Sequence, residues 1–419
     1  MKLVLKGANV FCADRLKRED VFISDGMIVP AFDPAESCRV IDFTGKYIFP
    51  GFTDVHVHLR EPGFSYKETM ATGTAAAARG GFTTLCSMPN LNPSPDGREG
   101  LAVQLETIAA GARVRALPVG AITRGSRGEE LADFEEMPEA VAFSDDGHGT
   151  TADILRKAMT RLRPLGKLIC SHCEDINLKG GDHIDAHAPF TSRLGIAGIS
   201  RESEYVQLER ELEAVAAVGG RYHMCHLSCR ESVELIRRAK AAGLDVSCET
   251  APHYLALDYT SITSDDGRFK MNPPLRSPAD REAIIEGLRD GTIDMIATDH
   301  APHSAAEKSR GLIGSAMGVV GLETAFAVCY TLLVKTNIIS LPRLVELMST
   351  APEKRFGITI GRGIGFPADI TVFDLEKNFT VDPSEFLSLG KSTPFSGKEL
   401  FGECLMTICN GKIVYERNI

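Results

Sequence analysis

The middle of the chain alternates between two patterns of apolar positions. Short apolar runs predict strands at residues 52–58, 82–87, 114–122, 141–143, 168–171, 222–226, 244–248 and 293–297. Between them, amphipathic or alanine-rich stretches predict helices at residues 69–79, 100–110, 152–162, 202–217, 231–241, 281–288 and 322–333. Eight strands that alternate with helices over roughly 300 residues predict a (β/α)₈, or TIM, barrel.

A doubly wound open sheet is the competing architecture for such an alternation. That fold usually carries a glycine-rich phosphate-binding turn directly after its first strand. No such turn follows residues 52–58, where the chain continues with leucine and arginine. The barrel is therefore the favoured prediction.

Both ends of the chain show a different, strand-rich pattern. Short strands are predicted at residues 3–5, 21–23, 47–49, 369–374 and 405–414, the last divided by the hairpin dipeptide Asn410-Gly411. Two β-rich ends around an α/β centre predict one small β-sandwich built from both termini. We expect residues 1–48 and 353–419 to form this domain and residues 49–352 to form the catalytic barrel.

Composition narrows the classes of function. The formal net charge is −10 and no long lysine or arginine run occurs, which argues against a general nucleic-acid surface. The 11 cysteines are scattered, and the one C-x-x-C, Cys170 to Cys173, has no second pair to make a zinc ribbon. No apolar run reaches the roughly 20 residues needed to span a bilayer, and the N-terminus resembles no cleaved signal. We expect a cytoplasmic enzyme.

Polar residues that could carry chemistry follow the predicted strands of the barrel, where the active sites of such barrels lie. In chain order they are His56, His58, Arg60, Asn90, Asp145, Asp146, His172, His226, Asp299 and His303. Four of the 11 histidines, His56, His58, His172 and His226, thus lie at the ends of three strands. Taken singly, each of these residues also suits a structural role, as a buried histidine, a turn residue or a helix cap. The whole set at one end of the barrel indicates an active site much more specifically than any one of them.

His56-Val57-His58 is the most informative of these motifs. Residues two apart on a strand point to the same face, so the two imidazoles make half of a zinc site. His172 and His226 are candidates to bind a second metal, with a carboxylate from Asp145 or Asp146 reaching between the ions. Two metal ions would activate a water, and a nearby carboxylate would move its proton; Asp299 is the candidate.

Three further residues suit an anionic substrate. Arg60 follows His58 by two residues, and on the same strand face its guanidinium would reach the cleft and pair with a carboxylate in bidentate fashion. Asn90 and Asn272 offer amide donors for the same anion, although each stands beside a proline and also suits a turn.

Motifs along the whole chain resemble those of dihydroorotases of the bacterial class I type. They are His56-Val57-His58-Leu59-Arg60-Glu61-Pro62-Gly63, Ser87-Met88-Pro89-Asn90, Phe143-Ser144-Asp145-Asp146-Gly147, His172-Cys173-Glu174-Asp175, Cys225-His226-Leu227-Ser228, Phe269-Lys270-Met271-Asn272-Pro273-Pro274-Leu275-Arg276, Ala297-Thr298-Asp299-His300-Ala301-Pro302-His303 and Lys391-Ser392-Thr393-Pro394-Phe395. The resemblance implies the reversible cyclisation of N-carbamoyl-L-aspartate to L-dihydroorotate in pyrimidine synthesis. It also implies a small-molecule substrate and a homodimer.

The resemblance also implies roles for the residues at the strand ends. His56, His58 and Asp299 would hold one Zn²⁺ and His172 and His226 the other, with Asp146 rather than Asp145 between them. A hydroxide that bridges the metals would attack the ring amide, with Asp299 as the proton shuttle. The residues expected to contact substrate are Arg60, Asn90, Asn272 and His303.

Two alternatives remain open at this point. The chain could be another cyclic amidase, such as a dihydropyrimidinase, hydantoinase or allantoinase. Many of these relatives bridge their metals with a carboxylated lysine, and residues 141–146 contain none. It could also be a non-catalytic, metal-binding scaffold subunit, but every expected metal ligand is present, which favours an enzyme.

Overall fold

Eight parallel strands form the centre of the computed structural model, which describes residues 2–12, 15–33 and 38–417. They pair in chain order: β6 (Phe52–Val57), β7 (Phe82–Ser87), β8 (Arg115–Ala121), β9 (Ala142–Ser144), β10 (Leu168–Ser171), β11 (Arg221–Met224), β12 (Val246–Thr250) and β13 (Met295–Ile296). The last strand returns to the first, because Val57 bridges His300 and the His58 N–H donates to the His300 carbonyl at 2.9 Å. The sheet is thus a nearly closed barrel, as predicted, and not an open doubly wound sheet.

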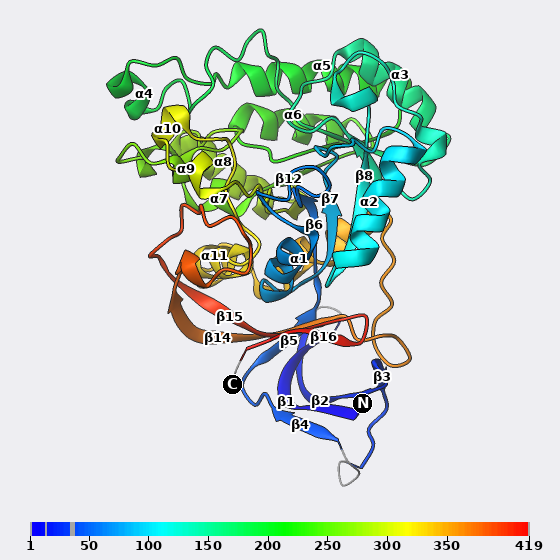
Figure 1. The fold of residues 1–419 in the computed structure, drawn as a ribbon. Helices are drawn as coiled ribbons and strands as arrows, with labels where there is room; N and C mark the ends of the chain where they lie inside the picture. Colours follow the sequence, from blue (N-terminus) through cyan, green and yellow to red (C-terminus); the bar gives the residue numbers. More distant parts are fainter. Residues whose placement is uncertain (1, 13–14, 34–37, 418–419) are drawn as a thin grey trace.

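Helices follow the strands and lie outside them (Figure 1). The longer ones are α1 (Met70–Arg79), α2 (Arg98–Gly111), α3 (Ala152–Leu162), α5 (Glu202–Val218), α6 (Arg230–Ala241), α8 (Pro278–Arg289) and α12 (Leu341–Met348). The shorter ones are α4 (Pro189–Leu194), α7 (Pro252–Ala256), α9 (Ala305–Lys308), α10 (Gly311–Gly314), α11 (Ala325–Cys329) and α13 (Thr350–Phe356). The six predicted helices between residues 69 and 288 are confirmed as α1, α2, α3, α5, α6 and α8.

Some predicted elements are displaced or incomplete. Strand β12 begins at Val246 and not at Leu244, because the Leu244 N–H still closes the end of α6 by donating to the Ala239 carbonyl. The predicted helix 322–333 begins only at Ala325 and continues after Cys329 as a π-helical turn, Tyr330–Val334. The short helices α4, α7, α9 and α10 and the pair α12–α13 were not predicted, since four to eight residues carry little helical periodicity.

Side chains fill the interior of the barrel. The packed residues are Val55, Cys86, Met88, Val119, Ala142, Leu168, Cys170, Cys225, Met295 and Ala297, and Phe356 of α13 packs with them. Nine of the 11 cysteines are buried, as is common for this small apolar side chain. Because the interior is solid, a substrate can reach the barrel only at its ends.

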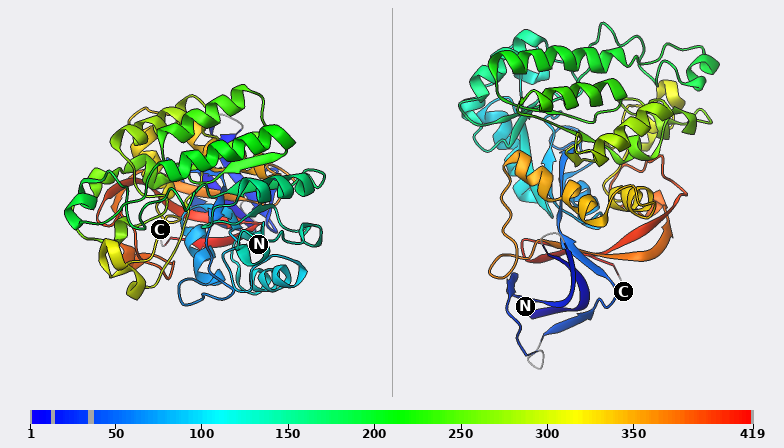
Figure 2. Two further views of the ribbon diagram at one scale, coloured as in Figure 1. Left: turned by 90° about the horizontal axis from the view of Figure 1, so that it is seen from above. Right: turned by 180° about the vertical axis from the view of Figure 1, so that it is seen from behind.

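Both ends of the chain build a second sheet beneath the barrel (Figure 1; Figure 2 shows it from behind). Its strands are β1 (Lys2–Cys12), β2 (Arg15–Ser24), β3 (Met27–Val29), β4 (Arg39–Asp42), β5 (Tyr47–Pro50), β14 (Ile370–Thr380), β15 (Glu399–Cys409) and β16 (Lys412–Glu416), in the order β16-β15-β14-β5-β1-β2-β3, with β4 also paired to β1. Asn410 and Gly411 form the predicted β15–β16 turn, both at positive φ.

Strands from both ends of this sheet share one apolar core, so the sheet is folded over its own side chains in the manner of a sandwich. That core includes Leu3, Val10, Ile48, Val372 and Met406. Joint construction from both termini, which the sequence predicts, is therefore confirmed. The division at residues 48/49 and 352/353 stays a prediction.

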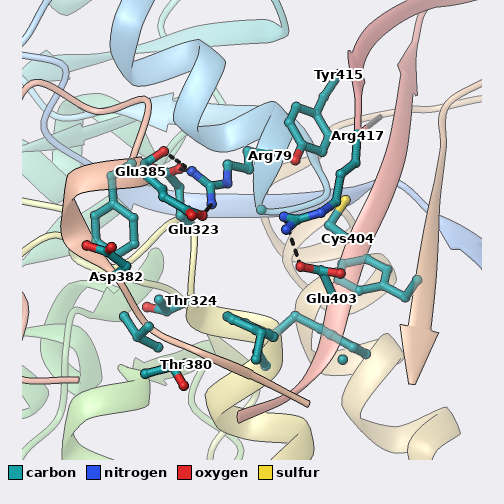
Figure 3. Close-up of a pocket in the computed structure, with 18 residues that line it drawn as sticks. Arg79, Glu323, Thr324, Thr380, Asp382, Glu385, Glu403, Cys404, Tyr415 and Arg417 are labelled. Carbon is teal, nitrogen blue, oxygen red and sulfur yellow. Dashed lines mark hydrogen bonds and ion pairs between the residues drawn. The ribbon is translucent and has the colours of Figure 1, made fainter. Parts of the chain in front are cut away.

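A buried carboxylate joins the barrel to the terminal part of the chain (Figure 3). Glu323 pairs with Arg79 of α1 at 3.1 Å, and its oxygens accept the backbone N–H groups of Leu387 and Ser388 at 2.9–3.2 Å. Burial raises the pKa of Glu323 to about 7, although Arg79, these N–H groups and Lys391 act in the opposite direction. The carboxylate that holds the segment at Leu387 and Ser388 therefore titrates near neutral pH.

The Glu323→Gln variant should change how stability depends on pH. The pKa of Glu323 is about 7 in the folded chain against 4.5 normally, so the unfolded state releases this proton first as pH rises. Relative to the variant, the wild-type free energy of unfolding should fall by about 3 kcal/mol between pH 4.5 and pH 7 and then stay level. Urea unfolding across this range measures the difference. The control is Glu385→Gln, because Glu385 lines the same pocket as Glu323 but its side chain is 62% exposed. A stability difference between wild type and Glu323→Gln that does not depend on pH would contradict the prediction.

Candidate metal centre and substrate cavity

Four histidine side chains meet at the carboxyl-terminal end of the barrel. His56 is the fifth residue of β6, His58 follows its last residue, His172 directly follows β10, and His226 lies two residues after β11. All four are buried. Strands that are far apart in the sequence thus bring imidazoles together, which is the arrangement that the strand-end positions predict.

Asp146 lies at the centre of these histidines. Its Oδ1 is 3.4 Å from His56 Nε2, 3.7 Å from His172 Nδ1 and 3.5 Å from His226 Nε2. Its Oδ2 is 3.4 Å from His58 Nε2. Although burial would raise the pKa of Asp146, the charge of His56 and the close approach of the His226 and His56 rings hold it well below the ordinary value.

Asp145, the alternative that the sequence left open, points away from the histidines. Its Oδ1 accepts the N–H groups of Ile122 and Thr123 at 2.9 and 3.0 Å, and its Oδ2 accepts the Thr123 hydroxyl. Adjacent residues place their side chains in opposite directions, and here only Asp146 faces the cluster. Asp145 holds the loop after β9 against the loop after β8.

Asp299 completes the cluster from the segment after β13. Its Oδ1 is 3.2 Å from His58 Nε2 and 3.7 Å from His56 Nε2. Burial would raise the pKa of Asp299, but the hydrogen bond from His58 and the charges of His56 and His58 outweigh it and hold the pKa below the ordinary value. The group is therefore a carboxylate at neutral pH.

The donor atoms of this cluster fit divalent metal ions. His56, His58 and Asp299 form one group whose ligand atoms lie within 4.8 Å of one another, and His56, Asp146 and His226 form another. His172 joins the second group, since its Nδ1 lies 2.9 Å from His226 Nε2. His56 Nε2 and Asp146 Oδ1 are buried and lack a hydrogen-bond partner. Unpaired buried imidazole and carboxylate atoms that converge in this way are the ligands expected for zinc and related ions.

A cavity of about 280 Å³ opens directly over the cluster. Of the residues predicted to contact substrate, Arg60, Asn90 and Asn272 line it. Asn90 donates to the Asp146 backbone carbonyl, and Asn272 Nδ2 lies 3.0 Å from Glu174 Oε1 and 3.3 Å from His172 Nε2. The predicted anion-binding groups and the candidate metal centre therefore share one cavity.

Arg60 reaches this cavity by a different route from the one predicted. Strand β6 ends at Val57, so Arg60 does not lie on a strand face. Instead it has a positive φ of 61°, and its Nε donates to the Pro302 carbonyl at 3.2 Å. His226 and Asp299 also have positive φ, at 31° and 47°. Backbone strain of this kind concentrates at functional sites.

His303 lies beside Arg60 but is not among the residues that line the cavity. Its Nε2 is 2.6 Å from the Met317 carbonyl, its Nδ1 is 3.2 Å from Lys67 Nζ, and Arg60 Nη2 lies 3.4 Å from Nε2. Burial and the charges of Arg60 and Lys67 lower the pKa of His303 to about 3. The neutral ring therefore donates from Nε2 to Met317 and accepts from Lys67 at Nδ1, so its contact with Arg60 is packing and not a hydrogen bond.

The cavity also contains two residues that the sequence reasoning missed. Glu174 and Lys179 line it, with Lys179 Nζ 3.2 Å from Glu174 Oε2. Burial would raise the pKa of Glu174, but the hydrogen bond and charge of His172, with the charge of Lys179, lower it to about 2. Glu174 stands in the His172-Cys173-Glu174-Asp175 motif after β10, so its position two residues from His172 was the available signal.

Comparisons with known proteins agree with this geometry. A family model described as "Dihydro-orotase-like" matches residues 45–232. A dihydroorotase of Geobacillus thermodenitrificans (strain NG80-2) is 50% identical over 382 residues, which cover 90% of this chain and 89% of the relative. A dihydroorotase of Listeria monocytogenes serotype 4a (strain HCC23) is 47% identical and covers 98% of both chains.

Solved structures share the fold over the whole chain. The L-hydantoinase (dihydropyrimidinase) from Arthrobacter aurescens has a TM-score of 0.87 at 26% identity, covering 100% of this chain and 96% of that chain. The dihydropyrimidinase from Brevibacillus agri NCHU1002 has a TM-score of 0.86 at 23% identity, covering 99% and 95%. At 23% identity, the similarity to the Brevibacillus agri structure shows only that the fold is shared.

The barrel, the buried histidine–carboxylate cluster at its carboxyl-terminal end and the likeness to the hydantoinase together define a cyclic amide hydrolase of the amidohydrolase class. The relatives that match nearly the full chain narrow this class. The chain belongs to the dihydroorotase family, and its activity is that of a dihydroorotase of pyrimidine biosynthesis. In the part of the chain that the structure describes, no helix is long and apolar enough to cross a membrane.

Proposed function

We propose that this site interconverts N-carbamoyl-L-aspartate and L-dihydroorotate with the aid of two Zn²⁺ ions. The observation that carries the proposal is the position of Asp146 among four histidines, directly beneath a cavity lined by Arg60. The arrangement suits an amide that also carries a carboxylate.

The residues divide into two ligand groups that share one carboxylate. His56, His58 and Asp299 would hold one ion and His172 and His226 the other, with Asp146 between them. Ions held in this way supply Lewis-acid chemistry, since they lower the pKa of a water molecule and polarise an amide carbonyl. Asp146 supports this assignment because its carboxylate contacts all four histidines.

Asp299 is the proposed proton carrier. In the hydrolytic direction a water oxygen bonds to the ring amide carbon, and the C–N bond breaks. Asp299 would take the proton that the water loses and deliver it to the departing nitrogen. Although burial would raise its pKa, His58 and His56 keep the carboxylate ionised, which is the form that can take up a proton.

Arg60 would hold the carboxylate of the substrate, aided by the amides of Asn90 and Asn272. Its guanidinium is held through Nε by the Pro302 carbonyl, so the N–H groups on both Nη atoms remain for a planar anion. His303 stays a predicted substrate contact. In the geometry described it lies beside Arg60, and direct contact with substrate would require its ring to leave Met317.

Family resemblance further supports a homodimer in the cytoplasm as the working assembly. The dimer is tested by light scattering of the purified chain, where a monomer mass would contradict it. The compartment is tested by cell fractionation, where recovery outside the cytoplasm would contradict it.

Removal of the metal should abolish the activity reversibly. Dialysis against a chelator is expected to leave a folded chain that no longer hydrolyses dihydroorotate, because the remaining side chains cannot activate water. Added Zn²⁺ should restore turnover at two ions per chain, measured by elemental analysis beside the assay. The same chelator saturated with zinc is the control. A zinc-loaded chain that interconverts neither compound at any pH would contradict the proposal and favour a scaffold subunit.

A further inference from the structure

Strand β12 contributes no proposed ligand, yet it carries a carboxylate behind the candidate metal centre. Glu249 is 1% exposed. Its Oε1 lies 2.7 Å from His56 Nδ1 and accepts the backbone N–H of His226 at 3.4 Å. Its Oε2 lies 3.2 Å from His223 Nε2. One carboxylate thus contacts proposed ligands of both ions without facing the cavity.

The contacts determine where the proton of His56 resides. A neutral imidazole has one N–H donor and one acceptor nitrogen. His56 Nδ1 lies against a carboxylate, which can only accept, so the hydrogen is on Nδ1. In the neutral ring that a metal ligand requires, Nε2 is then left with its lone pair, pointing toward Asp146 and Asp299 at 3.4 and 3.7 Å. That is the tautomer that a metal ligand needs.

A second histidine fixes Glu249 itself. Ser247 Oγ lies 2.8 Å from His223 Nδ1. If the serine hydroxyl donates to Nδ1, the His223 hydrogen is on Nε2 and points at Glu249 Oε2. Ser247, His223 and Glu249 then form a buried chain that ends on His56. The Leu227 N–H also donates to the Glu249 backbone carbonyl at 2.9 Å, which ties β12 to the segment that carries His226.

The same atoms argue against a third cation at this place. His56, Cys225 and Glu249 offer ligand atoms within 4.8 Å of one another. However, the hydrogen that the 2.7 Å contact requires on His56 Nδ1 leaves no lone pair there. The carboxylate therefore serves the histidine and not an ion of its own.

We propose that Glu249 is a positioning residue for the metal centre, which orients the His56 ring, holds its hydrogen on Nδ1 and restrains His226. This inference rests on the proposed function, since it assumes that His56 and His226 hold metal. A carboxylate hydrogen-bonded behind a ligating histidine raises the basicity of that ligand and strengthens metal binding. The inferred effect is on metal affinity first and on turnover through it.

The test compares Glu249→Ala and Glu249→Gln in the full-length chain. Zinc affinity is measured by competition with a chelator, and Co²⁺-substituted protein is examined by visible absorption. Loss of such a partner typically weakens metal binding about 10- to 100-fold. We expect that loss for Glu249→Ala, partial rescue in Glu249→Gln, whose amide oxygen still accepts from Nδ1, and a changed cobalt spectrum. The kcat should fall at a given zinc concentration with little change in KM.

Two further variants separate positioning from mere stability. Glu353→Gln removes another buried carboxylate, which accepts from Thr53 at 3.1 Å and contacts none of the four proposed histidine ligands. It should leave zinc affinity unchanged. Ser247→Ala removes only the first member of the hydrogen-bonded series Ser247–His223–Glu249–His56 and should weaken zinc binding slightly. This variant keeps the test valid if Glu249→Ala does not fold.

Wild-type zinc affinity and an unchanged cobalt spectrum in folded Glu249→Ala would overturn the inference, as would an equal loss of affinity in Glu353→Gln. Failure of the Glu249 inference is distinguishable from failure of the proposed function. If the proposed function fails, the wild-type chain itself lacks zinc or turnover, whatever the variants do.

Discussion

Replacement of Asp299 by asparagine should lower kcat for dihydroorotate hydrolysis by about 10³-fold or more, the range expected when a general acid–base is lost. Asparagine keeps the shape of the side chain but accepts no proton at neutral pH. Because Asp299 also faces His58 at 3.2 Å, some loss of bound metal is expected as well. The assay is therefore run at saturating zinc with the metal content measured on the same sample.

Asp294 provides a matched control for this prediction. It lies one residue before β13, whereas Asp299 lies three residues after it, and it pairs with Lys240 at 2.7 Å. Asp294→Asn should change kcat little. If Asp299→Asn retains more than about a tenth of the wild-type kcat with zinc bound, Asp299 is not the proton carrier.

Replacement of Arg60 by methionine should lower kcat/KM for dihydroorotate by about 10²- to 10³-fold and leave the bound zinc unchanged. Removal of one partner of a buried, hydrogen-bonded charge pair costs roughly 2–5 kcal/mol, because the other charge remains unpaired. Arg60 contacts the Pro302 carbonyl and the His303 ring. The metal content should therefore not depend on it.

The substrate range of Arg60→Met makes this test specific. Dihydrouracil has the same ring without the carboxylate, so any residual turnover of dihydrouracil should be unaffected by the change. Arg193→Met, at an exposed arginine of α4, is the control and should behave as the wild type. Normal kcat/KM for dihydroorotate in Arg60→Met would exclude the carboxylate contact.

The hydantoinase alternative illustrates what the fold leaves open. A TM-score of 0.87 with a hydantoinase shows that one backbone accommodates both kinds of ring. Substrate choice depends on a few side chains at the barrel end. In this chain an aspartate, Asp146, lies among the histidines, and Arg60 lines the cavity above it. Arg60 and Asn90 are the features that suit a substrate with a carboxylate.

The sequence by itself was sufficient for the class of fold and for most of the cluster. Apolar runs mark the strands because strands of a parallel barrel are buried on both faces. Polar residues after such runs must gather at one end of the barrel. The positions of the strands along the chain are therefore enough to bring together the side chains of His56, His58, His172, His226 and Asp299.

Tertiary structure alone decided which neighbouring side chains face the centre. Asp145 and Asp146 follow the same strand, and only the hydrogen bonds that Ile122 and Thr123 donate to Asp145 turn it away. Glu249 was missed because the end of β12 depends on pairing with β11 and β13, which local sequence does not record. His303 follows Asp299 in its motif, but the Met317 carbonyl, 14 residues further on, draws it behind Arg60. Strand positions follow from local hydrophobicity, whereas the direction of a side chain depends on partners distant in the chain.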